Sequence, residues 1–238
     1  SAFVAQDPSD CILSADYSQI ELRLLAHFSQ DPELLKAFKA DRDIHSFVAS
    51  QIFNVDIEDV SSEMRSQSKA VNFGIIYGQG AYGLSKTVGI TVGQAKDFIE
   101  EYFNRYSSIQ KFIYSVVEKA QKQGFVTTMA GHRRAIPGIK SRNFNTRTRA
   151  ERMAVNTVIQ GSAADLIKLA MINIHRKIVT KTLAIKMILQ IHDELVFELP
   201  EKDVQTHADW ILKEMTDAIK LDVPLKVDYA IGPSWLEE

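Results

Sequence analysis

Two aspartates, Asp16 and Asp193, each follow a short apolar run at a place where the chain must turn. Residues 11–15 are typical of a buried strand, and residues 183–191 and 194–199 are β-rich runs separated by two residues, which predicts a tight hairpin with Asp193 at its tip. If these strands are neighbours in one antiparallel sheet, the carboxylates can converge on magnesium, which proteins usually hold with one or two carboxylates. Two such ions can activate an attacking hydroxyl and stabilise a leaving oxygen in phosphoryl transfer. Taken singly, each aspartate is more simply a helix-flanking or turn-forming residue.

A predicted helix over residues 62–77 carries a stripe of cations and aromatic rings. Arg65, Lys69, Phe73 and Tyr77 recur every four residues and therefore share one face. Cations near a helix N-terminus oppose the helix dipole, but a polyphosphate bound there would interact favourably with both the cations and the helix end. The two rings would then meet the sugar and base of the same nucleotide. From the spacing alone, a solvated cationic turn followed by core aromatic residues is the simpler interpretation.

A third set of polar residues lies on a long predicted helix over residues 145–179. Arg152, Asn156 and Gln160 again recur every four residues, and all three carry hydrogen-bond donors. Such donors can meet the acceptor that every base pair presents in the DNA minor groove, and so test pairing without reading sequence. The basic residues between positions 133 and 152 suit contacts to phosphates. A solvated polar helix face is the alternative interpretation of both groups.

The elements that must position these residues predict an α+β fold with an antiparallel sheet and a mostly helical middle third. Helical periodicity covers residues 32–39, 44–53, 62–77 and 91–123. A small hairpin is predicted over residues 125–136, an amphipathic helix over 204–219 and a last strand over 224–230. Ser18 and Glu21 form a capping-box pattern that predicts a helix through about residue 28.

The composition limits the possible functions. The 238 residues are 45% hydrophobic and 24% charged, with a formal net charge of −2. Bulk positive charge therefore cannot hold nucleic acid, and any DNA contact must come from local clusters. The single cysteine excludes an internal disulfide and fits a reducing compartment. No apolar run approaches the ~18 residues that a membrane helix needs, so we expect no membrane partner.

Three motifs, in chain order, resemble those of the polymerase I-like family A DNA polymerases. Motif A is matched by residues 16–23 (DYSQIELR), motif B by residues 65–78 (R-xxx-K-xxx-F-G-xx-Y-G) and motif C by residues 190–194 (QIHDE). The resemblance covers essentially the whole chain, including residues 43–45 (DIH), 131–134 (GHRR) and 160–165 (QGSAAD). It implies DNA-directed DNA synthesis by attack of a primer 3′-hydroxyl on a deoxynucleoside triphosphate, with release of pyrophosphate.

The resemblance also implies roles for individual residues at the centre of the site. Asp16, Asp193 and the backbone carbonyl of Tyr17 would bind two magnesium ions, which Glu194 would support without being an obligatory ligand. Arg65 and Lys69 would hold the incoming triphosphate, and Lys69 would also donate a proton to the departing pyrophosphate.

Further residues would surround the nucleotide and the DNA. Those lining the nucleotide pocket would be Gln19, Glu21, His45, Phe73 and Tyr77, and those meeting the primer-template would be Arg152, Asn156, Gln160 and His192. Glu21 has two compatible interpretations. It can complete the capping box, and, partnered by Tyr77, it can fill the space that a ribose 2′-hydroxyl needs.

The family resemblance predicts a palm at residues 1–39, helical fingers at 40–125 and a second palm segment at 126–238. We expect a monomeric fragment without thumb or exonuclease domains, whose partners are primer-template DNA and deoxynucleoside triphosphates. The expected location is the cytoplasm of a bacterium, at the nucleoid during function, with a eukaryotic organelle as the alternative.

Three rival functions use part of the same pattern. A two-metal nuclease would need Asp16 and Asp193 but not the stripe of Arg65, Lys69, Phe73 and Tyr77. A single-subunit RNA polymerase is disfavoured by Glu21. A DNA-binding fragment with little or no catalysis would not need both intact constellations. Nucleotide incorporation on a primed template separates these cases.

Overall fold

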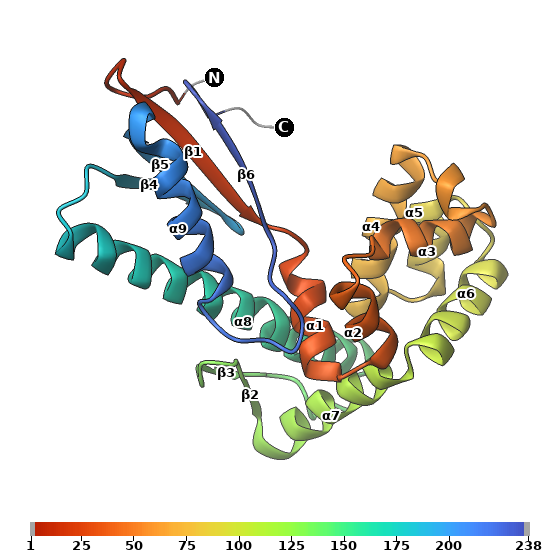
Figure 1. Cartoon of the computed structure of the whole chain (residues 1–238). Helices are drawn as coiled ribbons and strands as arrows, with labels where there is room; N and C mark the ends of the chain where they lie inside the picture. The colour runs from red at the N-terminus through yellow and green to blue at the C-terminus, as the bar shows by residue number, and fades with distance from the viewer. Residues whose placement is uncertain (1–2, 236–238) are drawn as a thin grey trace. The chain divides into compact units, whose positions relative to one another are not determined.

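The computed structural model describes residues 3–235 and combines a four-stranded antiparallel sheet with a large set of helices (Figure 1). The predicted α+β class is confirmed. The chain divides into two compact units, one formed by Ser1–Leu24 with Gln160–Glu238 and the other by Leu25–Ile159. The division into palm and fingers at residues 40 and 125 remains a prediction.

The first unit contains the sheet, whose strands are β1 (Asp10–Tyr17), β4 (Lys186–Ile191), β5 (Glu194–Pro200) and β6 (Val227–Gly232). Their order is β4-β5-β1-β6, and each neighbouring pair is antiparallel. Both the first strand and the two-residue hairpin between β4 and β5 confirm the sequence prediction.

One face of this sheet is covered by α9 (Val204–Thr216), which follows the short 3-10 helix η2 (Glu201–Asp203). Buried side chains of paired residues, such as Leu13 and Phe197, belong to this face. Tyr17 also points to it, since its buried hydroxyl donates to the Met215 carbonyl of α9 at 2.7 Å. Because side chains alternate along a strand, Asp16 lies on the opposite face.

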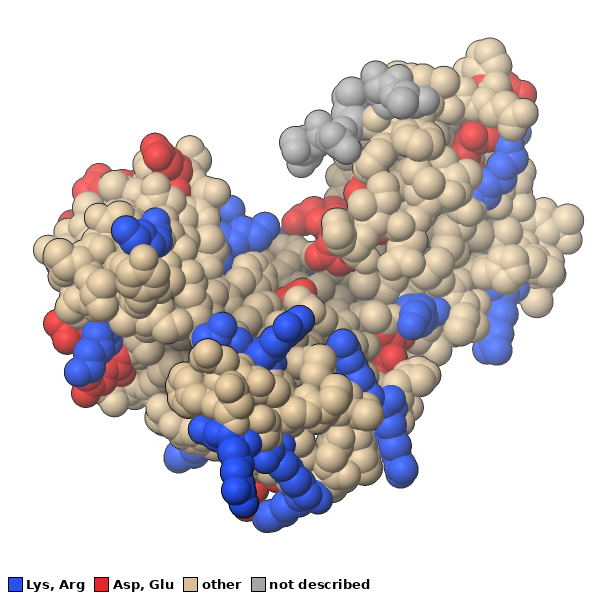
Figure 2. Space-filling view, turned by 180° about the vertical axis from the view of Figure 1, so that it is seen from behind, with Lys and Arg blue, Asp and Glu red and all other residues tan. Residues whose placement is uncertain are grey.

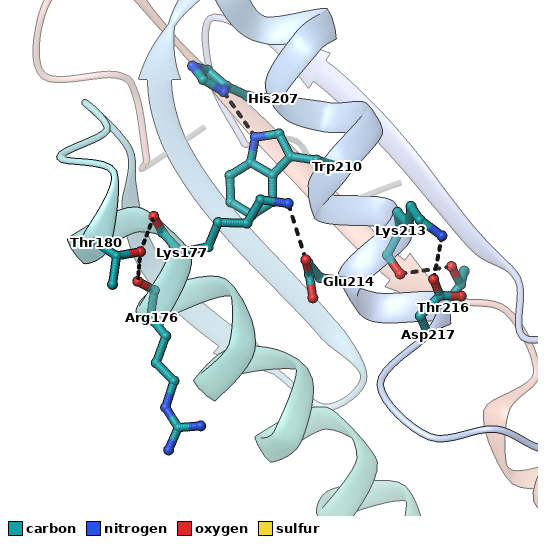
Figure 3. Close-up of polar contacts among 9 residues, drawn as sticks. All are labelled: Arg176, Lys177, Thr180, His207, Trp210, Lys213, Glu214, Thr216 and Asp217. Carbon is teal, nitrogen blue, oxygen red and sulfur yellow. Dashed lines mark hydrogen bonds and ion pairs between the residues drawn. The ribbon is translucent and has the colours of Figure 1, made fainter.

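The C-terminal part of the long helix α8 (Phe144–Thr180) packs beside α9 (Figure 3). The Lys177 ammonium lies 3.1 Å from a carboxylate oxygen of Glu214 and 4.3 Å from the centre of the Trp210 ring. The Trp210 indole N–H donates to Nδ1 of His207 at 3.1 Å. This pairing joins the two helices on the side of the sheet away from Asp16.

The second unit is almost entirely helical. After α1 (Ile20–Ser29), which begins in the first unit, its elements are α2 (Pro32–Lys39), α3 (Ile44–Phe53), η1 (Ile57–Asp59), α4 (Ser62–Ile76), α5 (Ala81–Val88), α6 (Val92–Arg105), α7 (Ser107–Gln123), β2 (Phe125–Thr127), β3 (Arg133–Ala135) and the first part of α8. Side chains of Asp31, Asp43, Ser61 and Thr91 cap α2, α3, α4 and α6. These caps explain why the predicted helix starts were close to the observed ones.

Two expectations about helices were wrong, one in each unit, and one helix was not expected. The helix expected over residues 91–123 is two helices, because Tyr106 leaves the helical conformation with φ −103° and ψ 55°. The short helix α5 was not expected. The capping box of Ser18 and Glu21 is not formed as predicted, since α1 begins at Ile20 and Gln19, with φ 55°, is the residue that precedes it. Within residues 3–235, none of the helices combines the length and apolar character that crossing a membrane requires.

Candidate active site

Asp16 and Asp193 come together on the open face of the sheet, as their positions at strand ends predicted. Asp16 is opposite Glu194 in the β1–β5 register, and the Tyr17 N–H donates to the Asp193 carbonyl at 3.2 Å. The two carboxyl groups are close enough to share a hydrogen bond. Reduced hydration, the charges of Asp193 and Glu194, and this hydrogen bond raise the pKa of Asp16 to about 6.

Buried contacts hold the backbone around Asp16 rigid. Besides the Tyr17 hydroxyl bond, the buried guanidinium of Arg23 donates to the carbonyls of Ser18 at 2.8 Å and Pro224 at 2.6 Å. The Ser18 N–H in turn donates to the carbonyl of Lys226 at 2.8 Å. The Asp16 carboxyl is therefore exposed on a fixed strand end, which is the condition for presenting it to a cation without further ordering.

The carboxyl pair suits magnesium better than a metal with a closed protein cage. Among residues 3–235, no group of three or more His, Cys, Asp or Glu side chains is arranged to hold a metal ion. Magnesium usually needs only one or two carboxylates, with water and substrate oxygens completing its shell. A cation between Asp16 and Asp193 would also offset the repulsion that raises the pKa of Asp16.

In the second unit, α4 presents the predicted stripe. Arg65 and Lys69 are exposed, whereas Phe73 and Tyr77 are half-buried, with ring centres 6.2 Å apart and planes inclined by 20°. The aromatic residues are therefore accessible and are not part of the fully buried core. This arrangement fits a surface with a cationic end and an aromatic end, as the spacing indicated.

Arg65 has a partner that the sequence did not suggest. Its Nε lies 2.5 Å from the Asp43 carboxylate, which also caps α3 through the His45 N–H at 3.0 Å. Burial alone would raise the pKa of Asp43, but hydrogen bonds from Arg65 and Ser46 lower it below its usual value. The ion pair occupies only the Nε edge of the guanidinium.

His45 lies beneath this surface and is almost fully buried. Burial lowers the pKa of His45 to about 4, so the ring is neutral near pH 7. The buried Asn72 amide donates to its Nδ1 at 3.1 Å, and its ring centre is 6.1 Å from that of Phe73. The Ser68 hydroxyl donates to the His45 carbonyl at 2.6 Å. In this structure these contacts of His45 are with side chains of α4. Its expected contact with a nucleotide remains a prediction.

The polar residues of α8 differ in their environments. Arg152 and Gln160 are exposed, whereas Oδ1 of Asn156 is buried without a hydrogen-bond partner among the described residues. Basic side chains lie on the hairpin of β2 and β3 and at the start of α8. On β3, the Arg134 guanidinium donates to the hydroxyl of Thr157 in α8 at 3.0 Å. Figure 2 shows Lys and Arg side chains gathered in the lower part of the molecule, where this hairpin and α7 lie in Figure 1.

Gly78 brings the backbone close to Arg152. Its φ is 79°, and a Cβ there would lie 3.0 Å from Cγ of Arg152 and 3.1 Å from its Nε. The glycine after Tyr77 therefore allows the Arg152 side chain to lie against the turn that ends α4.

We expect Gly78→Ala to lower the free energy of unfolding by about 1–2 kcal/mol because of its left-handed backbone, and to displace Arg152. Urea unfolding measures the first effect, and a change in DNA affinity reports the second. Gly80→Ala is the matched control, since Gly80 has φ −81° and no atom within 4 Å of a built Cβ. Equal stability of the two variants would contradict the strain expected from the left-handed backbone at Gly78.

The remaining expected site residues lie in the first unit. Glu21 accepts a hydrogen bond from the Gln160 amide at 3.4 Å, and Oε1 of Gln19 is buried without a partner among the described residues. His192 is exposed at the hairpin tip with φ 52°. Because Glu21 and Tyr77 fall in different units, their expected partnership remains a prediction.

The chain matches the model of DNA polymerase family A over residues 1–237. The chain belongs to this family. Its family A relatives include DNA polymerase I of Bacillus subtilis (strain 168), 48% identical, and that of Geobacillus stearothermophilus, 47% identical, each aligned over 99% of this chain. The chain spans only 27% of the length of these family A proteins.

A solved family A structure is also similar. It is the POL domain of Pol1 from M. smegmatis in complex with DNA primer-template and dNTP, with a TM-score of 0.93 and 43% identity. The match covers 98% of this chain and 41% of that one. The family A fold is therefore present nearly throughout the described residues.

Proposed function

We propose that this chain carries the catalytic residues for template-directed DNA synthesis at a primer 3′ end. The observation that supports this most directly is the pair of Asp16 and Asp193 on a rigid sheet, in a chain whose α4 presents Arg65 and Lys69. Membership in DNA polymerase family A and the primer-template and dNTP bound by the similar M. smegmatis domain support the same reaction. A nuclease needs no exposed stripe of cations and aromatic rings.

In the proposed reaction, Asp16, Asp193 and the carbonyl of Tyr17 would hold two magnesium ions, and the bonds of Tyr17 and Arg23 keep these ligands in place. When bound, the ions supply Lewis acidity and neutralise charge at the reacting phosphate. The primer 3′-hydroxyl attacks the α-phosphate of a deoxynucleoside triphosphate, and pyrophosphate leaves. Positioning and charge stabilisation provide most of the acceleration in such transfers.

The residues of α4 act on the triphosphate. Arg65 keeps Asp43 on its Nε edge and turns its remaining N–H groups to the phosphates. Lys69 binds the same anion and donates a proton to the leaving pyrophosphate. Phe73 and Tyr77 provide apolar surface for the sugar and base. His45, buried and neutral, fixes the position of Phe73 and of the backbone near Ser68.

Around the DNA, we propose that Arg152, Asn156 and Gln160 contact the minor groove near the primer end, and that His192 lies beside the primer terminus. Gln19 and Glu21 border the sugar of the incoming nucleotide.

Glu21→Ala should weaken selection against ribonucleotides by roughly ten- to a hundredfold, because it opens the space that a 2′-hydroxyl needs. The measurement is the ratio of kcat/KM for a deoxynucleoside triphosphate to that for its ribose analogue. Gln160→Ala, which removes one hydrogen-bond donor to Glu21 but not its carboxylate, should change this ratio less. If Glu21→Ala preserves the ratio, Glu21 does not select the sugar.

Primer extension tests the function itself. The chain spans 27% of the length of its relatives. The assay therefore uses both the 238-residue chain and a chimera in which this chain replaces the matching segment of the Bacillus subtilis enzyme. We expect templated incorporation by the chimera in the presence of magnesium, with weaker activity by the shorter chain. A chimera that folds and binds primer-template but adds no nucleotide would refute the proposal and favour a DNA-binding role.

A further inference from the structure

Glu194 follows Asp193 directly in sequence. Its carboxylate accepts hydrogen bonds from two residues, neither of which is a proposed metal ligand. The Trp235 indole N–H donates to Oε1 of Glu194 at 2.7 Å, and the Ser14 hydroxyl donates to the same oxygen. Both donors are neutral, so they fix the position of the carboxylate while leaving its charge intact.

The register of the sheet gives the direction in which Glu194 leans. Its Cα is opposite Asp16, whereas Ser14 is opposite Val196, which lies one two-residue strand repeat further from the hairpin tip. That repeat is roughly 7 Å along the strand. To reach the Ser14 hydroxyl, the Glu194 side chain must lean away from the tip that carries Asp193.

The position of Trp235 is itself fixed by the first residues of the described chain. The backbone N–H of Trp235 donates to the Phe3 carbonyl at 2.9 Å, and the two rings meet edge to face with centres 5.7 Å apart. Val4 and Ser234 form a β-bridge beside them. The indole is thus an anchored donor, and its partner is the carboxylate of Glu194, which follows Asp193 in sequence and is not one of the pair.

We propose that Trp235 and Ser14 are positioning residues that hold Glu194 out of direct coordination of the metal at Asp16 and Asp193. The inference rests on the magnesium site of the proposed function. Magnesium leaves several positions of its octahedral shell to water and phosphate when only one or two carboxylates bind it. A third carboxylate would occupy a position that the substrate needs and would hold the ion more tightly. Hydrogen bonds to groups beside a metal are known to control such geometry.

Direct binding of Mn²⁺ to the 238-residue chain tests the inference without an activity assay. Electron paramagnetic resonance measures the Kd from the signal of free Mn²⁺. Trp235→Phe keeps an aromatic ring against Phe3 but removes the indole N–H, so Glu194 loses one of its two donors and reaches the ion more readily. We expect Mn²⁺ to bind about tenfold more tightly. Ser14→Ala should shift the Kd in the same direction.

Two further variants identify the cause. In the double variant Trp235→Phe with Glu194→Gln, the gain in affinity should disappear, because the freed side chain no longer carries a charge. Trp210→Phe is the matched control, since it removes an indole N–H that donates to His207 on α9, on the other face of the sheet (Figure 3). Its Mn²⁺ affinity should equal that of the unmodified chain.

An unchanged or weaker Mn²⁺ affinity in both Trp235→Phe and Ser14→Ala overturns the inference. A weaker affinity would mean that the two donors hold Glu194 in place as a ligand. Circular dichroism establishes that each variant is folded, and Ser14→Ala decides the matter if Trp235→Phe does not fold. If the unmodified chain binds no Mn²⁺, or binds it equally well after Asp16→Asn, the proposed metal site itself fails. Binding that depends on Asp16 but not on Trp235 or Ser14 leaves that site intact and rejects only the inference.

Discussion

Asp193→Ala should reduce nucleotide incorporation by roughly a thousandfold or more, since a metal site supplies several kcal/mol of transition-state stabilisation and each 1.36 kcal/mol is worth about tenfold in rate. The structure puts the Asp193 carboxyl beside that of Asp16 at a hairpin tip, and the next carboxylate, that of Glu194, accepts hydrogen bonds from Trp235 and Ser14. Single-turnover primer extension with the chimera measures the loss.

Stability distinguishes this loss from damage to the fold. Burial and then the neighbouring carboxylates raise the pKa of Asp16, so removing Asp193 relieves part of the cost of its charge and should not lower the Tm. Asp10→Ala is the matched control, because Asp10 is the first residue of β1 and lies at the opposite end of that strand from Asp16. It should retain incorporation. Turnover near that of the unmodified protein in Asp193→Ala would exclude the two-aspartate metal site.

The elements that carry the site could be predicted from sequence because their signals are local. The helices Pro32–Lys39 and Ile44–Phe53 were predicted with the bounds observed, since an aspartate caps each of them. The two-residue hairpin was predicted from two β-rich runs with no room for a longer loop. The break at Tyr106 was missed because helical periodicity continues through it. At the break, the buried Tyr106 ring lies against that of Tyr102, one turn earlier, with their centres 4.9 Å apart.

The side-chain partners of the site were less predictable, because they join residues far apart in sequence. Asp43 was noticed only as part of a family motif, and its ion pair with Arg65 depends on the packing of α3 against α4. The burial of His45 depends on the same packing. The donation from Trp235 to Glu194 requires that the chain after β6 pair with the residues near Phe3. None of these contacts has a signature in local periodicity.

Lys69→Ala should lower kcat/KM for the incoming deoxynucleoside triphosphate by roughly a hundred- to a thousandfold, in line with the usual contribution of a general acid. The Lys69 ammonium is exposed on α4, one turn beyond Arg65, and no hydrogen bond or ion pair with another described residue holds it. It is therefore available to an anion, whereas Arg65 already shares its Nε edge with Asp43. Primer-template affinity should change little, because a single phosphate contact is a small part of duplex binding.

Lys69→Arg separates the two roles proposed for this residue. Arginine keeps the positive charge but does not release a proton at ordinary pH, so it should restore triphosphate affinity while kcat stays low. Rapid-quench kinetics with the chimera gives both quantities, and fluorescence anisotropy gives the DNA affinity. Lys96→Ala, which removes another exposed lysine of the same unit, serves as the control and should match the unmodified protein. If Lys69→Ala weakened only primer-template binding, Lys69 would face the DNA and not the triphosphate. Full recovery of kcat by Lys69→Arg would show that its charge alone is required and that the proton comes from another donor.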